Sequence, residues 1–386
     1  MLENLQPAER IPQKLAPRPA VHFDGNEGAA VTPGYESQPE NFDEFLIDAG
    51  LDPKDIEVIP PLRTSRWQQQ KDGELVWLTS YRFTFRKRHS EIDLPLAVAA
   101  SKKKAKPKPL SANSEKAVVV LWSDLQVGKV DIHGGLDSLI ERVTETRLRL
   151  IQFIKKEKPS RVVFVDLGDT VENFTNKADQ QQLYLNQASI MEQVDLATTM
   201  AYEAIRDVAA LVPSVIYASV GSNHCQWRIG KQAVGKSTDD WGVFIGRQLA
   251  RLAEATETKN LTFVEPNEWD ESLAVDVFGD EYHVLGIVHG HQVRRPTDLV
   301  RWWRGQSFGQ QPVAAATILC HGHFHHLSVE ETGMTQYGQS RFRIGAPTLD
   351  NGSSWFRNIS GEQATPGLAI FTLEKDKPFG GTVFKL

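Results

Sequence analysis

Residue types that bind metal ions occur in five short motifs along the C-terminal two thirds of the chain. Carboxylates, amides and imidazoles together form a ligand set that suits Mn²⁺, Fe or Zn²⁺. Each motif alone is common in turns and helix caps, so only their ordered combination favours a metal centre over coincidence. The motifs are Asp124-Leu125-Gln126, Gly168-Asp169, Asn223-His224, His289 and Gly322-His323-Phe324-His325.

The elements that must position these motifs alternate between strands and helices from residue 117, which is typical of an α/β domain. In α/β sheets, ligand sites form where the carboxyl ends of strands open into loops, so we expect the motifs to meet at one edge. Helices are predicted at 136–157, 179–212 and 240–255. Strands are predicted at 117–122, 161–167, 214–220, 261–265, 273–278, 282–288, 316–320, 340–345 and 368–374.

The N-terminal part of the chain is predicted to form a separate small α+β domain. Residues 1–40 are rich in Pro, Gly, Glu and Ala without periodicity, which indicates a disordered segment. Residues 41–97 begin with a capped helix and continue into a β-hairpin with a turn at Lys71-Asp72-Gly73. Residues 98–116 carry a run of lysines with two prolines and are predicted to be a basic linker, so 117–386 would be the catalytic domain.

Composition bounds the class of protein. A net charge of −6 and a hydrophobic fraction of 40% indicate a soluble globular chain, and two cysteines argue against an extracellular disulfide scaffold. The N-terminus lacks an apolar signal region, and no apolar run approaches the ~20 residues of a spanning helix. We therefore expect a cytoplasmic protein with no membrane partner. The basic excess over 63–108, beside an acidic N-terminus, fits a nucleic-acid contact and a solvated surface equally well.

The five motifs resemble the pattern of the calcineurin-like metallophosphoesterases, written D-x-H, G-D-x-x-[DE], G-N-H, H and G-H-x-H. The resemblance covers about 117–375 and is greatest to the SbcD-type DNA-repair nucleases. It implies a four-layer sandwich of two mixed β-sheets flanked by helices. Chains of this layout also occur in phages, which would place the protein in the host cytoplasm. The stretches that carry the closer resemblance are Ser123 to Lys129, Ile318 to His325, and Gly345-Ala346-Pro347.

The resemblance implies a role for each motif residue. A hydroxide bridging two divalent ions would attack phosphorus in line. The expected metal is Mn²⁺, and Fe, Zn or Mg²⁺ are alternatives. His224 would protonate the leaving-group oxygen, and Glu172 would orient His224. The first ligand set would be Asp124, Gln126, Asp169 and His325. The second ligand set would be Asp169, Asn223, His289 and His323, with Asp169 shared.

Three positions depart from the family pattern. Gln126 stands where a His is usual, Ser222 is inserted between Gly221 and Asn223, and Cys225 follows His224 where an acid is common. Because an amide oxygen is a weaker ligand than an imidazole, the occupancy of the first ligand set is left open.

Basic and aromatic residues near the motifs favour a nucleic-acid substrate. The Ser/Thr phosphatases that share this pattern carry an Arg after the second motif, whereas Asn173 follows Glu172 here. Arg can pair with phosphates and Trp can stack on bases, although Trp302 and Trp303 could instead anchor an insertion onto the core. The expected substrate contacts are Lys129, Trp227, Arg228, Arg294, Arg295, Arg301, Trp302 and Trp303.

These features together predict a two-metal-dependent phosphodiesterase that hydrolyses nucleic acid, with a DNA exo- or endonuclease as the leading expectation. A phosphodiesterase for cyclic nucleotides or oligonucleotides, a phosphomonoesterase and a non-catalytic nucleic-acid-binding relative remain alternatives. SbcD-type enzymes usually work with an ATPase, and this chain has no Walker A segment, so such a partner would be a separate protein. A homodimer is also left open.

Overall fold

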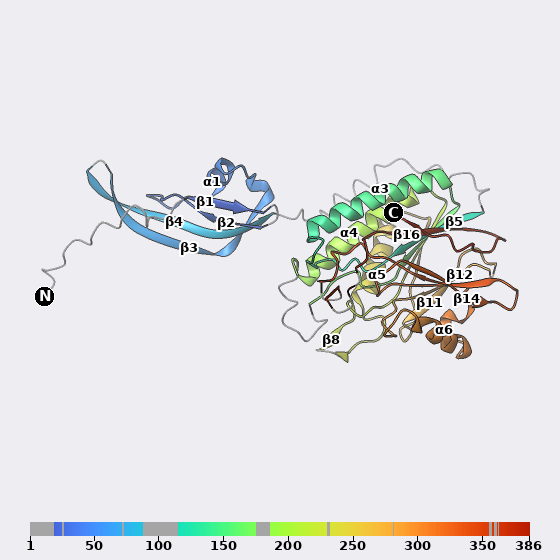
Figure 1. The fold of residues 1–386 in the computed structure, drawn as a ribbon. Helices are drawn as coiled ribbons and strands as arrows, with labels where there is room; N and C mark the ends of the chain where they lie inside the picture. The colour runs from blue at the N-terminus through green and yellow to red at the C-terminus, as the bar shows by residue number, and fades with distance from the viewer. Residues whose placement is uncertain are drawn as a thin grey trace. The chain divides into compact units, whose positions relative to one another are not determined.

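The structure is a computed structural model of the 386-residue chain. The chain divides into two compact units, Met1–Glu91 and Ile92–Leu386, which are described separately (Figure 1). The residues that the structure describes are 19–24, 27–71, 73–87, 115–174, 186–229, 232–280, 282–354, 357–358, 361 and 363–386.

The first unit is a four-stranded antiparallel sheet in the order β1-β2-β4-β3. It also contains a short helix α1 (Asp43–Asp48) and a 3₁₀ turn η2 (Pro53–Asp55). Tyr81, Phe83 and Phe85 are buried on one face of β4, as period-two alternation requires. The long β3–β4 pair confirms the predicted hairpin. The strands are β1 (Ala20–Phe23), β2 (Glu27–Val31), β3 (Ile56–Lys71) and β4 (Glu74–Lys87).

The prediction of disorder over 1–40 is wrong for residues 20–31. These residues form β1 and β2, and β2 pairs with β4 over its whole length. Phe23 stacks on Phe85 with ring centroids 5.7 Å apart, and Ala30 is buried. The order comes from long-range pairing with a strand fifty residues away, which local composition does not reveal. Residues 1–18, and 88–114 of the predicted domain edge and basic linker, lie outside the described residues.

The second unit is an α/β domain with two mixed sheets, as predicted at the level of fold class. The six-stranded sheet has the order β10-β7-β6-β5-β16-β17, with β10, β7, β6 and β5 parallel. The five-stranded sheet has the order β11-β12-β13-β15-β14, with β12, β13 and β15 parallel.

All nine strands predicted after residue 117 are present. The six-stranded sheet contains β5 (Lys116–Trp122), β6 (Arg161–Asp166), β7 (Ser214–Ser219), β10 (Leu261–Val264), β16 (Ala369–Glu374) and β17 (Phe384–Lys385). The five-stranded sheet contains β11 (Ser272–Asp276), β12 (Val284–Val288), β13 (Ile318–His321), β14 (Ser328–Met334) and β15 (Ser340–Gly345). A separate two-stranded hairpin consists of β8 (Arg228–Ile229) and β9 (Gln232–Ala233).

The predicted helices are also present. They are α3 (Leu136–Glu157), α4 (Ile190–Ala209) and α5 (Trp241–Ala255), and residues 175–185 of the predicted 179–212 helix lie outside the described residues. A further helix, α6 (Asp298–Phe308), and a 3₁₀ turn η4 (Pro312–Ala315) were not predicted. None of the helices in the described part of the chain has the length and apolar character that crossing a membrane requires.

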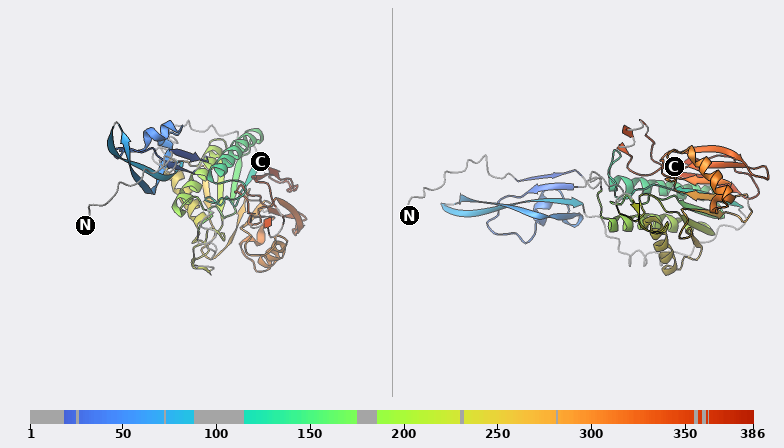
Figure 2. Two further views of the ribbon diagram at one scale, coloured as in Figure 1. Left: turned by 60° about the vertical axis from the view of Figure 1, so that its left-hand side comes forward. Right: turned by 90° about the horizontal axis from the view of Figure 1, so that it is seen from below.

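Three apolar clusters hold these layers together. One lies between the two sheets and includes Leu121, Ile287 and Phe371. A second joins the six-stranded sheet to α3, α4 and α5, and a third joins the five-stranded sheet to α6 and η4. Figures 1 and 2 show α3 and α4 side by side, with α6 away from them. The packing fixes the two sheets so that the loops after their parallel strands form one site.

Candidate metal centre

The predicted ligands follow the carboxyl ends of strands from both sheets, and six of them gather in one place. Because β5, β6 and β7 are parallel neighbours, the loops after them share one edge of the first sheet. The same holds for β12 and β13 in the second sheet. The six residues are Asp124 after β5, Asp169 after β6, Asn223 after β7, His289 after β12, and His323 and His325 after β13.

Sharp turns with left-handed backbone carry several of these ligands. Asp124 has φ 50°, Asp169 has φ 49° and His323 has φ 66°. Such backbone conformations are uncommon for residues other than glycine. They occur often at functional sites, where contacts with the surrounding structure hold the strained backbone in place. Gly168 precedes Asp169 with φ 92°, and a Cβ there would collide with Ser222. A glycine is therefore required where Asp169 turns toward Asn223.

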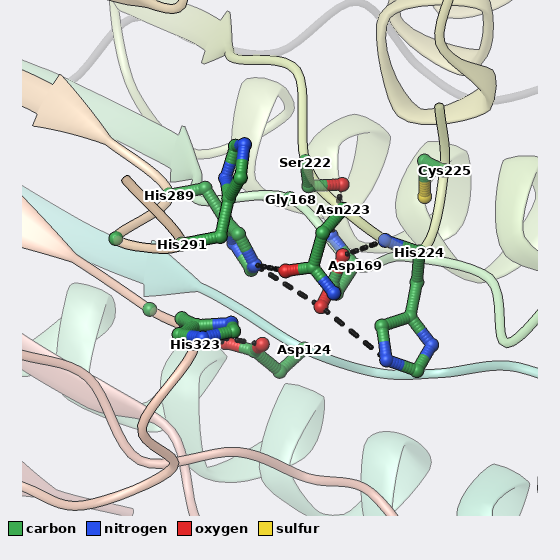
Figure 3. A network of polar contacts seen from close by, with 12 residues as sticks. Asp124, Gly168, Asp169, Ser222, Asn223, His224, Cys225, His289, His291 and His323 are labelled. Atoms are coloured by element: carbon green, nitrogen blue, oxygen red, sulfur yellow. Dashed lines mark hydrogen bonds and ion pairs between the residues drawn. The ribbon is translucent and has the colours of Figure 1, made fainter. Parts of the chain in front are cut away.

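The tightest group of donors surrounds the carboxylate of Asp169 (Figure 3). His289 Nε2 lies 3.0 Å from Asp169 Oδ2 and 2.9 Å from Asn223 Oδ1. His289 Nδ1 lies 2.7 Å from the carbonyl oxygen of Leu167, which accepts its proton and leaves Nε2 facing the carboxylate. Ligand atoms of Asp169, His289 and His323 all lie within 4.8 Å of one another. Together with Asn223 they match the predicted second ligand set and suit one divalent ion.

Charge in this group is arranged around Asp169. Burial opposes ionisation of its carboxyl, but the neighbouring His289 and His224 outweigh burial and hold the pKa of Asp169 well below its usual range. Burial likewise opposes a charge on His289, but Asp169 outweighs it and raises the pKa of His289 to about 9. Burial, with His289 nearby, lowers the pKa of His323 to about 4. A neutral His323 and an ionised Asp169 are in the protonation states that metal ligands need.

Binding of Mn²⁺ to this group is expected to tighten as pH rises from about 6 to about 7.5, roughly tenfold per pH unit. His289 is protonated below its pKa of about 9, and the ion must displace the Nε2 proton. Proton and ion compete, so affinity increases with pH until about 9. Calorimetric titration in two buffers of different ionisation enthalpy would detect the released proton. A pH-independent affinity would contradict the assignment of His289 as a ligand.

The predicted catalytic pair lies beside the same carboxylate. The backbone N–H of His224 donates to Asp169 Oδ1 at 2.7 Å, and His224 Nε2 lies 3.9 Å from Asp169 Oδ2. His224 Nδ1 lies 3.2 Å from Glu172 Oε2, an ion-pair contact without aligned hydrogen-bond geometry. Burial lowers the pKa of His224, but Asp169 and Glu172 together outweigh burial and raise it. The two carboxylates therefore favour the protonated ring, the form that a proton donor needs.

The predicted first ligand set is arranged differently. Asp124 Oδ1 lies 3.3 Å from His325 Nε2, so these two residues do meet. The side-chain oxygen of Gln126 instead accepts a hydrogen bond from Lys129 Nζ at 2.5 Å. The amide nitrogen of Gln126 lies 3.3 Å from His224 Nε2. The oxygen that a metal ion would need from Gln126 is therefore already bonded to an ammonium group.

Sequence reasoning missed Asp350. This buried carboxylate lies 2.8 Å from Lys129 Nζ and 3.6 Å from His325 Nδ1 through Oδ2. It follows β15, so the placement of polar residues after parallel strands would have found it. Asp240 was also missed as a support: it caps α5 and accepts the Ser222 N–H at 2.8 Å, which fixes the loop that carries Asn223.

Two of the expected substrate contacts are buried in the structure. Lys129 is only 8% exposed, and its ammonium is paired with Asp350. Trp303 is 3% exposed, and its indole N–H donates to the carbonyl of Val313 at 2.9 Å. It anchors α6 on the second sheet, so neither face is free for a base.

The remaining expected contacts are exposed or half-buried and lie in two places. Trp227 is 54% exposed and packs edge-on against Trp241, and Arg228 donates to the side chain of Gln226. Arg295, Arg301 and Trp302 line an open hollow of about 500 Å³ along α6, where Arg295 pairs with Asp298. Arg294 is exposed next to this hollow in sequence.

Comparison with known proteins places the chain in no family. No family model matches it, and no curated protein matches it. Among solved structures, it is similar to GAP50, described as the anchor in the inner membrane complex of Plasmodium. The two are 12% identical over 70% of this chain and 88% of that chain, with a TM-score of 0.28. A similarity at this level supports no conclusion about fold or function.

Proposed function

We propose that this chain is a metal-dependent phosphodiesterase of the calcineurin-like metallophosphoesterase type, similar to SbcD-type nucleases, and that it acts on nucleic acid. The observation that carries this proposal is the position of Asp169. One carboxylate oxygen faces the ligand imidazole of His289, and the other accepts the N–H of His224. A set of metal ligands and a proton donor thus share one buried carboxylate. The order of the apolar clusters, with helices outside and two sheets inside, supports the four-layer sandwich.

Asp169, Asn223, His289 and His323 would hold a divalent ion, with Mn²⁺ expected first, and its Lewis acidity would activate water and neutralise phosphoryl charge. The protein's own contribution begins with orientation. The carbonyl of Leu167 fixes the ring of His289, and Ser222 Oγ accepts the backbone N–H of Asp169 at 2.7 Å. Ligands fixed in this way lose little freedom when they bind an ion.

His224 would act as the general acid. Its Nε2 faces the Asp169 carboxylate, while Glu172 lies next to Nδ1 and stabilises the imidazolium. The Nε2 proton would pass to the leaving-group oxygen as the phosphorus–oxygen bond breaks. Asn173 donates to the carbonyl of His224 at 3.0 Å, so it holds the His224 backbone in place.

The surroundings of His224 support a diester substrate over a monoester. Asn173 occupies the position where the phosphatases of this pattern carry a phosphate-gripping Arg, and its side chain is committed to the protein backbone. Trp227, Trp241 and Phe244 form a row of edge-on aromatic pairs, each with ring centroids 6.0 Å apart. Exposed aromatic faces of this kind suit the bases of a single strand.

Trp227→Ala is expected to raise KM for a single-stranded oligonucleotide about tenfold, the loss of one stacked base. Turnover of a small diester should stay within about twofold, because such a substrate has no base to stack. Trp269→Ala, which removes an exposed tryptophan outside the expected substrate contacts, is the matched aromatic control and should leave KM unchanged. The test is Mn²⁺-dependent cleavage of labelled single- and double-stranded DNA by the three proteins. Equal KM values for wild type and Trp227→Ala would reject stacking at this position, and cleavage of neither DNA would reject the nucleic-acid substrate.

A further inference from the structure

Lys129 places a positive charge inside the predicted first ligand set. Its side chain is almost completely enclosed, and its Nζ lies 2.5 Å from Gln126 Oε1 and 2.8 Å from Asp350 Oδ2. An ammonium group is costly to bury unless it is paired and hydrogen-bonded, and these two oxygens meet that requirement. The buried ammonium group is thus stabilised by specific partners in the interior.

The two acceptors of Lys129, Gln126 and Asp350, are connected to residues of the predicted first ligand set. Asp350 Oδ2 also lies 3.6 Å from His325 Nδ1, and His325 Nε2 lies 3.3 Å from Asp124 Oδ1. The polar contacts therefore run without a break from Gln126 through Lys129 and Asp350 to His325 and Asp124. This series of contacts therefore already contains a positive charge, the ammonium group of Lys129.

The two predicted ligand sets differ in how their donor atoms converge. Asp169, His289 and His323 direct three donor atoms to within 4.8 Å of one another. Across the described part of the chain, no second trio of carboxylate, imidazole or thiolate donors converges in this way. The residues of the first ligand set therefore do not fit a metal ion in the way that the second set does.

We propose that the Lys129 ammonium takes the place of the first ion, so that the chain binds a single divalent ion at Asp169, Asn223, His289 and His323. This inference rests on the proposed function, since it concerns the charge beside the same reacting centre. The sequence agrees with the loss of the first ion, because Gln126 stands where the family pattern has a ligand imidazole. An amide oxygen is a weaker metal ligand than the imidazole it replaces but a good acceptor for an ammonium group. The amide nitrogen of Gln126 lies 3.3 Å from His224 Nε2, so the ammonium is one side chain away from the proposed proton donor.

The stoichiometry of Mn²⁺ binding to the full chain tests this inference without reference to activity. We expect native mass spectrometry and calorimetric titration to give one Mn²⁺ per wild-type chain, and electron paramagnetic resonance to give the spectrum of an isolated ion. His289→Ala should bind none tightly. The double variant Gln126→His/Lys129→Ala should bind two, with an exchange-coupled spectrum. Lys236→Ala, which removes an exposed lysine paired with Glu268, is the control and should still bind one.

The outcomes separate the inference from the proposed function. Two ions in the wild-type chain would overturn the inference and leave a two-metal phosphodiesterase. No bound ion and no hydrolysis in the wild type would overturn both. One ion in a double variant that melts as cooperatively as the wild type would show that Lys129 does not exclude the second ion, which also overturns the inference. If the double variant does not fold, Lys129→Met, which keeps the length of the side chain, replaces it, and the wild-type stoichiometry still decides.

Discussion

Asp169→Asn is expected to lower kcat/KM for Mn²⁺-dependent diester hydrolysis by more than about 10³-fold, because it removes the charge on which the centre depends. The carboxylate contacts His289 through one oxygen and the His224 backbone through the other. An amide keeps the shape but supplies no negative charge to a divalent ion. We therefore also expect Mn²⁺ affinity to fall beyond detection by calorimetry.

The control for this change is Asp195→Asn on the exposed face of α4, which alters the net charge equally. Thermal unfolding with a chelator present would show whether Asp169→Asn still folds. A folded Asp169→Asn protein that retains wild-type Mn²⁺ affinity would contradict the assignment of the centre.

His224→Ala is expected to lower kcat by about 10²- to 10⁴-fold on a substrate with a poor leaving group, while Mn²⁺ binding remains. The ring lies beside the ligands and between two carboxylates, which raise the pKa of His224 against the effect of burial. A general acid matters most when the departing oxygen is strongly basic. We therefore expect a much smaller loss on a p-nitrophenyl diester, whose leaving group departs without a proton.

The comparison of the two leaving groups is the measurement that identifies the role of His224. Glu172→Gln, which keeps the contact with Nδ1 but removes the charge, should give an intermediate loss of about 10- to 100-fold. Equal losses on both substrates would mean that His224 acts by binding or by placing Asn223, and would reject it as the proton donor.

The sequence predicted most of the second unit because its strands are short apolar runs that end in polar residues. The runs before Asp124, Asp169 and Asn223 are buried on both faces, as parallel strands between layers are. Elements at the surface were harder to find. β14 consists largely of polar residues at a sheet edge, and its order depends on pairing with β15. α6 could have been found from Leu299 and Trp303, which lie four residues apart and are both buried.

The site was predictable where ligands follow strands and unpredictable where side chains compete for one another. Position after a strand located Asp169 and His289, and it would also have located Asp350. The side-chain oxygen of Gln126, in contrast, is held by Lys129, three residues later in sequence. The hydrogen-bond partner of a side-chain amide oxygen depends on tertiary packing and cannot be read from the sequence. For the same reason the sequence left open whether Trp303 contacts a substrate or anchors an insertion, since basic neighbours in sequence do not reveal which face of a helix is buried.

The most direct test of the central claim is the rate of hydrolysis of bis-p-nitrophenyl phosphate and of p-nitrophenyl phosphate by the wild-type chain, after metal removal and after addition of Mn²⁺. The account predicts that the diester is hydrolysed only when Mn²⁺ is present, faster than the monoester, and that Asp169→Asn abolishes this activity. A chain that binds Mn²⁺ but hydrolyses only the monoester, or neither substrate, would contradict a phosphodiesterase centred on Asp169.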